Sequence, residues 1–139
     1  MRQSAGGGRD GGTILVAEDD DGTRATVARL LERLGYTVLW APDGIQALRM
    51  AEQHADFIDL LLTDVMMPGL TGPQLASRLQ RVAPHVPVIY MSGYPEDALA
   101  EVKGLQLETD FVAKPFTIVT LARRIADKIG SAISASEGR

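Results

Sequence analysis

The chain has 139 residues, enough for one compact domain with a buried core and too few for two ordinary domains. Its formal charge of -4 disfavours a nucleic-acid surface, and the absence of cysteine excludes disulfides, thiol nucleophiles and thiolate metal sites. Because no stretch approaches ~18 uninterrupted apolar residues and no apolar signal segment opens the chain, we expect a cytoplasmic protein without a membrane anchor of its own.

In chain order, short apolar runs alternate with segments whose apolar residues recur at helical spacing. The apolar runs predict five strands, at residues 13–17, 36–40, 58–63, 86–91 and 111–113. The segments that follow these strands predict five helices. Asp43 is expected to cap the second helix, and Thr71 and Pro73 to open the third. Since glycine commonly ends helices, the first should end at Gly35 and the fifth at Gly130.

The two ends of the chain differ in composition from the rest. Residues 1–12 and 131–139 are small, polar and aperiodic, which predicts a flexible leader and a flexible tail around one domain at residues 13–130. Within that domain, strict alternation of strand and helix implies right-handed crossovers and a parallel sheet covered by helices on both faces. The predicted fold class is therefore α/β, doubly wound.

Functional sites of doubly wound folds lie at the carboxyl ends of the strands. The polar residues predicted there are Glu18 and Asp19 after the first strand, Asp64 after the third, Ser92 after the fourth and Lys114 after the fifth. An ionised carboxylate at the end of an apolar run loses hydration unless a cation, a metal or several N–H donors replace it. Asp64 is such a carboxylate, so its position indicates chemistry.

Three carboxylates gathered together repel one another, so at neutral pH they hold either protons or a cation. We predict Mg2+, with Mn2+ as an alternative, because these cations take oxygen ligands and no histidine or cysteine in the pattern points to a softer metal. With the cation, Lys114 and Ser92 to neutralise a phosphoryl group, Asp64 is predicted to act as nucleophile and to form an aspartyl phosphate.

Four segments carry a resemblance to a known family: ILVAEDDDGTR at 14–24, LLLTDVMMPGLTG at 60–72, VIYMSGY at 88–94 and DFVAKPF at 110–116. Together they resemble the receiver domain of two-component response regulators. The resemblance implies a flavodoxin-like parallel sheet with strand order 2-1-3-4-5. It also implies that a histidine kinase or a histidine phosphotransfer protein phosphorylates Asp64, and that the domain is a signalling module, monomeric or weakly dimeric, rather than an enzyme.

The resemblance also assigns a metal site. Asp19, Asp64 and the main-chain carbonyl of Met66 would hold Mg2+, and Glu18 would act through water. Relatives that lose the phosphoryl group quickly often carry polar residues two positions beyond the acceptor and two beyond the serine. Met66 and Tyr94 stand at those positions here, so we expect slow to moderate loss of the phosphoryl group.

The same resemblance implies a switch. Ser92 and Lys114 would bind the phosphoryl group, and movement of Ser92 toward it would be coupled to rotation of Phe111. Many relatives have tyrosine at this position, so here the ring lacks a hydroxyl and a switch must act through packing. The peptide bond between Lys114 and Pro115 is expected to be cis, as X-Pro bonds permit.

Two other functions are less consistent with the sequence. Residues 19–23 also resemble the DxDGT motif of haloacid-dehalogenase-like phosphatases, with Asp19 as nucleophile and Asp21 as acid/base. That assignment leaves Asp64 without a role and finds no acidic residue at a strand end beyond Lys114. A pure interaction module would not need the complete set of chemical residues. The segments MSGYPEDAL and TGPQLA favour the receiver of a hybrid sensor histidine kinase over a free-standing response regulator.

Overall fold

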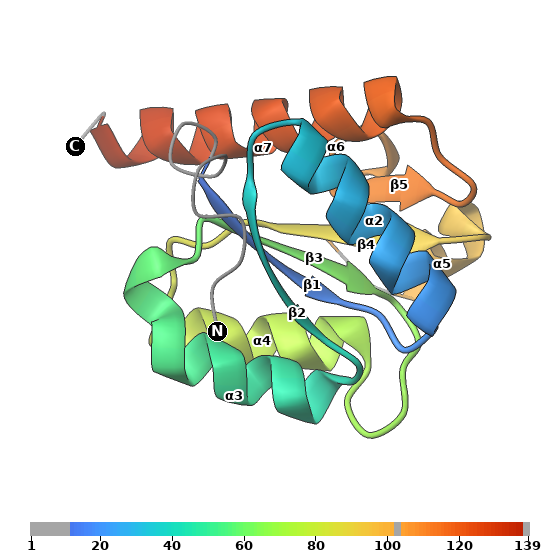
Figure 1. Ribbon diagram of the computed structural model, residues 1–139, viewed down its shortest axis with the longest axis horizontal. Helices are drawn as coiled ribbons and strands as arrows, with labels where there is room; N and C mark the ends of the chain where they lie inside the picture. The colour runs from blue at the N-terminus through green and yellow to red at the C-terminus, as the bar shows by residue number, and fades with distance from the viewer. Residues whose placement is uncertain (1–11, 102–103, 138–139) are drawn as a thin grey trace.

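The computed structural model describes residues 12–101 and 104–137, and five parallel strands form one sheet at its centre (Figure 1). The strand order is β2-β1-β3-β4-β5, as predicted. The bounds of the strands are Thr13–Ala17 for β1, Thr37–Ala41 for β2, Leu60–Asp64 for β3, Val88–Ser92 for β4 and Phe111–Ala113 for β5. The predicted leader at residues 1–12 lies outside the described residues except for Gly12.

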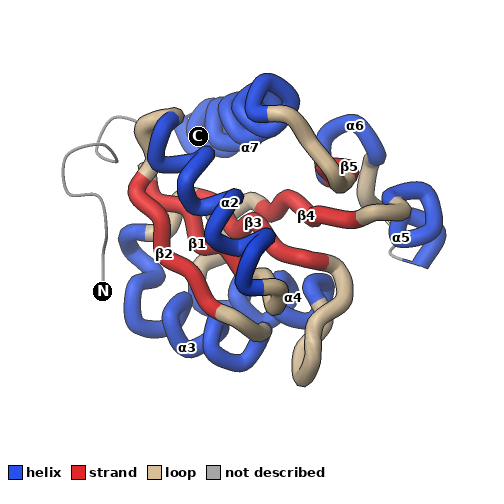
Figure 2. The backbone as a smooth tube through the Cα atoms, turned by 45° about the vertical axis from the view of Figure 1, so that its right-hand side comes forward, coloured by secondary structure: helices blue, strands red, loops and turns tan. Residues whose placement is uncertain are grey.

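Helices cover both faces of the sheet, which confirms the doubly wound α/β fold. Helices α3 and α4 lie on one face and α2 and α7 on the other, while α5 lies at the β5 edge (Figures 1 and 2). The bounds are Asp21–Arg33 for α2, Gly44–His54 for α3, Ala55–Phe57 for the 3-10 helix η1, Gly72–Val82 for α4, Pro95–Glu101 for α5, Leu107–Asp110 for α6 and Ile118–Glu137 for α7.

The core has two layers because successive side chains of a strand point to opposite faces of the sheet. In β3, Leu61 packs with the α3 and α4 layer, whereas Leu60 and Leu62 pack with the α2 and α7 layer. All three side chains are fully buried. This two-sided burial explains why the central strand is nearly all apolar instead of alternating.

The helix starts agree with the sequence analysis. The Asp43 carboxylate accepts the Gln46 N–H at 2.8 Å at the start of α3. Thr71 and Gln74 form a reciprocal capping box at the start of α4. Gly35 follows α2 with a φ of 98°, a left-handed conformation that glycine adopts without strain.

The predicted end of the last helix at Gly130 is wrong, because α7 continues to Glu137. Gly130 does not adopt a left-handed backbone, and a glycine inside a helix costs only about 1 kcal/mol. The helical residues on both sides of it outweigh that cost. The domain limits of 13 and 130 stay predictions, and residues 138–139 lie outside the described part.

Strands β3 and β4 begin two residues later and end one residue later than the sequence analysis predicts, and β2 is shifted by one residue. Strand β3 begins at Leu60, two residues after η1 gives way to extended backbone at Ile58, and β4 begins at Val88 because Pro87 has no N–H to donate. Asp64 and Ser92 are the last residues of β3 and β4, rather than the first residues after them. Sheet hydrogen bonding thus fixes their backbones.

The short helices η1 and α6 were not predicted. The Asp110 carboxylate at the end of α6 accepts the Gln106 N–H at 2.6 Å, and the Arg124 guanidinium donates to the Leu107 carbonyl at 3.2 Å. The first contact is local, whereas the second joins α6 to α7 and requires the folded chain. Among the described helices, none combines the length and the apolar character that crossing a membrane requires.

Candidate functional site

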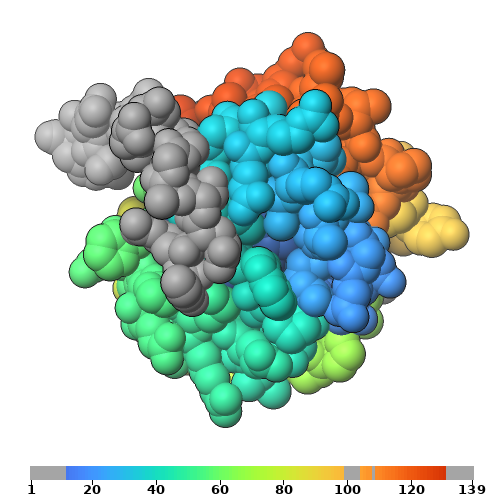
Figure 3. Space-filling view, viewed as in Figure 1, coloured from blue at the N-terminus to red at the C-terminus, as the bar shows by residue number. Residues whose placement is uncertain are grey.

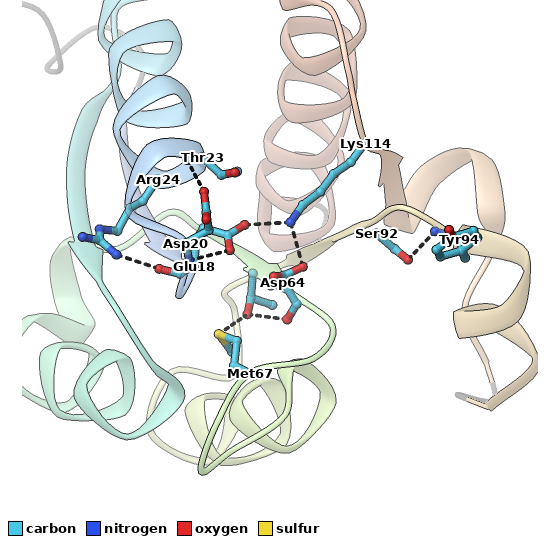
Figure 4. A network of polar contacts seen from close by, with 10 residues as sticks. Glu18, Asp20, Thr23, Arg24, Asp64, Met67, Ser92, Tyr94 and Lys114 are labelled. Carbon is cyan, nitrogen blue, oxygen red and sulfur yellow. Dashed lines mark hydrogen bonds and ion pairs between the residues drawn. The ribbon is translucent and has the colours of Figure 1, made fainter.

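The structure brings the predicted polar residues together at the carboxyl edge of the sheet (Figure 4). Glu18 directly follows β1, Asp64 ends β3 and Lys114 directly follows β5. The parallel register places Asp64 beside Met91 and Ser92 beside Ala113, so neighbouring strands end at the same level. The topology, rather than the sequence separation, therefore creates the site.

Lys114 joins the two carboxylates of the site. Its Nζ donates to Glu18 Oε1 at 2.8 Å and to Asp64 Oδ1 at 3.0 Å. Burial alone would lower the pKa of Lys114, but hydrogen bonds and charge attraction from Glu18 and Asp64 outweigh it, and the pKa is raised. The ammonium group is consequently charged at neutral pH and offsets part of the negative charge of the site.

Glu18 is held on every side. Glu18 is only 1% exposed. Its second carboxylate oxygen, Oε2, accepts the Asp20 N–H at 3.0 Å. The Glu18 N–H donates to the Ala41 carbonyl at 3.2 Å, which attaches the loop after β1 to the end of β2. A buried carboxylate with hydrogen-bond partners on both oxygens keeps a fixed position.

Glu18, Asp19 and Asp64 each offer a carboxylate oxygen, and these three atoms lie within 4.8 Å of one another. Glu18 is buried, Asp64 is partly buried and Asp19 is exposed. An all-oxygen donor set with one side open to solvent suits a cation that retains several waters, which is the behaviour of Mg2+. The donor chemistry therefore fits the predicted cation.

The next two acidic residues have other partners. The Asp20 carboxylate caps α2 by accepting the Thr23 N–H at 2.8 Å, and this hydrogen bonding lowers the pKa of Asp20. Asp21 is largely exposed and pairs with Arg24 at 2.6 Å. Neither belongs to the acidic cluster of Glu18, Asp19 and Asp64.

Ser92 and Phe111 lie near the site without contacting its carboxylates by a described hydrogen bond. The Ser92 Oγ accepts the Tyr94 N–H at 3.0 Å. Phe111 is 2% exposed, and its ring packs against Tyr90 with centroids 5.6 Å apart. Burial, and secondarily the charge of Asp110, raises the pKa of Tyr90 to about 12.

Two backbone features lie beside the site. The Lys114–Pro115 peptide bond is cis, as expected. A Cβ added to Gly72 would lie 2.3 Å from the carbonyl oxygen of Asp64, so only glycine fits there. The Gly72 N–H also donates to the Val65 carbonyl at 2.7 Å. The sequence analysis did not identify Gly72, because only the fold shows what lies beside it.

Comparison with known proteins gives consistent results. The response regulator receiver domain family matches residues 14–126. The sensor kinase CckA of Brucella abortus is 35% identical over 117 residues, which cover 84% of this chain and 12% of that protein. The chain spans between 12% and 48% of the length of CckA and two bacterial regulators that it matches.

Solved structures show the same similarity in three dimensions. The receiver domain of the hybrid histidine kinase CckA has a TM-score of 0.72 at 42% identity, covering 85% of this chain and 99% of that one. The receiver domain of the sensor histidine kinase PA1611 from Pseudomonas aeruginosa also has a TM-score of 0.72, at 31% identity, covering 86% and 98%. That structure holds a magnesium ion in its active-site cleft.

Proposed function

The chain belongs to the response regulator receiver domain family, and from this premise we propose that Asp64 stores a phosphoryl group received from a phosphohistidine. The observation that carries the proposal is the position of the Asp64 carboxylate. It ends a buried strand, lies 3.0 Å from the Lys114 ammonium and forms part of a cluster of three carboxylates. A nucleophile, a cation-binding set and a fixed positive charge thus meet at one point.

In the proposed reaction, a carboxylate oxygen of Asp64 attacks the phosphorus of the donor. The O–P bond to Asp64 forms as the N–P bond of phosphohistidine breaks, and the imidazole departs with the electron pair. Lys114 binds Asp64 Oδ1, which orients the carboxylate and leaves Oδ2 for attack. The ammonium group then lies next to the phosphoryl oxygens, where it stabilises their charge.

We propose that Asp19, Asp64 and the Met66 carbonyl hold Mg2+, or Mn2+, and that Glu18 acts on it through water. When bound, the cation neutralises negative charge on the phosphoryl oxygens. Glu18 is suited to this indirect role because Lys114 and the Asp20 N–H already occupy its two oxygens. Asp19 is exposed and therefore accessible to a hydrated cation.

The proposed switch involves Ser92 and Phe111. In the state described, the Ser92 hydroxyl accepts the Tyr94 N–H, and its own O–H can donate to a phosphoryl oxygen. Phe111 lacks a hydroxyl and is buried against Tyr90, so its rotation changes packing alone. Phosphorylation would shift the population between two packings of this region and change partner binding.

The donor we propose is a histidine kinase or a histidine phosphotransfer protein. The similarity to CckA and PA1611 supports origin in a hybrid sensor histidine kinase over a free-standing regulator. We further propose that the domain works in the cytoplasm, as a monomer or weak dimer.

The test is incubation with Mg2+ and a small phosphodonor such as acetyl phosphate, followed by intact mass. We expect one added phosphate on the wild type and none on Asp64→Asn. Asp21→Asn is the matched control, since this aspartate pairs with Arg24 outside the cluster, and it should label normally. Absence of phosphate on the wild type, under conditions that label another receiver, would overturn the proposal. Labelling that survives in Asp64→Asn but is lost in Asp19→Asn would favour the phosphatase instead.

A further inference from the structure

Arg24 on α2 makes three contacts around the loop that carries the acidic pair. Its Nη1 donates to the Glu18 carbonyl at 2.9 Å, and its Nη2 pairs with Asp21 at 2.6 Å. Its Cζ lies 4.6 Å from the centroid of the Trp40 ring. Figure 4 shows the guanidinium beside the Glu18 main chain. Arg24 has no role in the phosphoryl transfer proposed above.

These contacts join three elements. Trp40 lies on β2 directly before Ala41, whose carbonyl accepts the Glu18 N–H. The peptide groups of Glu18 are therefore bonded to β2 through the N–H and to α2 through the carbonyl. In Figure 3, the blue to cyan surface of α2 meets the teal surface at the end of β2 and the start of α3. Arg24 of α2 contacts Trp40 of β2.

The contacts differ from those of an ordinary helix ion pair. Asp21 is 89% exposed, so its pairing with Arg24 is screened by solvent and contributes little. The Arg24 side chain is 13% exposed, because Trp40 and the Glu18 carbonyl hold the guanidinium. A planar guanidinium can stack and donate at once, which a lysine ammonium cannot do.

We propose that Arg24, stacked on Trp40, is a positioning residue that fixes the main chain of Glu18 and thereby sets the affinity of the acidic cluster for Mg2+. The inference rests on the proposed function. Asp19 follows Glu18 directly, so rotation of the Glu18 carbonyl moves the carboxylates of both residues. Groups outside the ligand set that orient the ligands typically change metal affinity 10- to 100-fold when mutated.

The charge of Arg24 and its positioning role predict opposite changes in Mg2+ affinity when Arg24 is replaced. As a cation bound to the main-chain carbonyl of Glu18, Arg24 repels Mg2+ at the neighbouring cluster, so removing its charge would strengthen Mg2+ binding if electrostatics were its only effect. As a positioning residue, it holds the loop in the geometry that binds Mg2+, so its removal weakens binding. The direction of the change therefore decides between the two.

The experiment is titration calorimetry of Mg2+ into the full chain, with Arg24→Gln compared with Arg29→Gln. Arg29 is exposed on the same helix, so both variants lose one positive charge from α2. We expect Arg24→Gln to bind Mg2+ about tenfold more weakly than Arg29→Gln. Equal or tighter binding by Arg24→Gln would overturn the inference while leaving the proposed function intact. Failure of the wild type to bind Mg2+ would instead overturn both.

Trp40→Leu provides a second test if Arg24→Gln does not fold. Trp40 is 44% exposed on an edge strand, so its replacement spares the core. Loss of the stacking should weaken Mg2+ binding about two- to fivefold, and Trp40→Phe, which keeps an aromatic face, should recover most of it. Circular dichroism without Mg2+ checks that each variant is folded. Unchanged affinity in a folded Trp40→Leu protein would contradict the inference.

Discussion

Replacing Lys114 with methionine should lower the stability of the protein when Mg2+ is absent. The same replacement should increase the stabilisation that Mg2+ provides on binding. In the wild type, the ammonium lies 2.8 Å from Glu18 Oε1 and 3.0 Å from Asp64 Oδ1. Methionine keeps much of the aliphatic volume and removes the charge. Two neighbouring carboxylates, one of them 1% exposed, then lose their shared cation.

The magnitude follows from burial. Removing one partner from a buried ion pair typically costs 3–5 kcal/mol, because the other charge stays in a poorly solvated place. The Lys114 and Asp64 side chains are 26% and 16% exposed, so solvent screens part of the loss. We therefore expect a loss of about 3 kcal/mol in the free energy of unfolding in EDTA. Without the repelling ammonium, Mg2+ should bind about tenfold more tightly, which adds about 1.4 kcal/mol of stability at saturation.

The assay is urea unfolding in EDTA and in saturating Mg2+, with Lys128→Met as the matched control. Lys128 forms an ion pair with Asp110, away from the acidic cluster. The control should lose stability to the same extent with and without Mg2+. The reasoning would be refuted if Lys114→Met lost less than about 1 kcal/mol in EDTA, or if Mg2+ stabilised both variants equally.

Three further predictions concern other parts of the site. Gly72→Ala should lose about 1–3 kcal/mol of stability and slow phosphorylation, because its Cβ would lie 2.3 Å from the Asp64 carbonyl oxygen. Gly130→Ala, whose Cβ meets nothing within 4 Å, should lose no stability. Equal urea midpoints for the Gly72→Ala and Gly130→Ala proteins would contradict this prediction. Met66→Asn should shorten the lifetime of the phosphorylated protein, measured by intact mass against time, and an unchanged lifetime would exclude Met66 as the cause of slow hydrolysis. The pKa of Tyr90 is raised to about 12, so its contribution to stability is complete below pH 10 and is lost between pH 10 and about 12. In Tyr90→Phe, the free energy of unfolding should therefore fall by about 2 kcal/mol less than in the wild type as the pH rises from 10 to about 12. The same fall in both proteins would contradict the raised pKa of Tyr90.

The parts of the structure that the sequence predicts depend on periodicity and local chemistry. Strands and helices alternate as expected, and the strand ends that carry Glu18, Asp64 and Lys114 converge because parallel strands end on one edge. The caps at Asp43 and Thr71 are local, so neighbouring residues identify them.

The parts that the sequence does not predict depend on contacts between distant segments. Gly72 is restricted by the carbonyl of Asp64, and the short helix α6 is held by Arg124 on α7. The contact of Arg24 with Trp40 joins α2 to β2. Gly130 predicts a helix end by local sequence, but the helix continues through it to Glu137 because the residues on both sides favour helix. None of these outcomes follows from local spacing.

The stacking of Arg24 on Trp40 also has a spectroscopic consequence. Trp40 is the only tryptophan in the chain, so the intrinsic indole emission of the unlabelled protein originates at one position. That indole contacts the side chain that holds the Glu18 carbonyl. Any rearrangement of the acidic loop should therefore change the emission, and the protein carries its own optical probe for the site without dye or label.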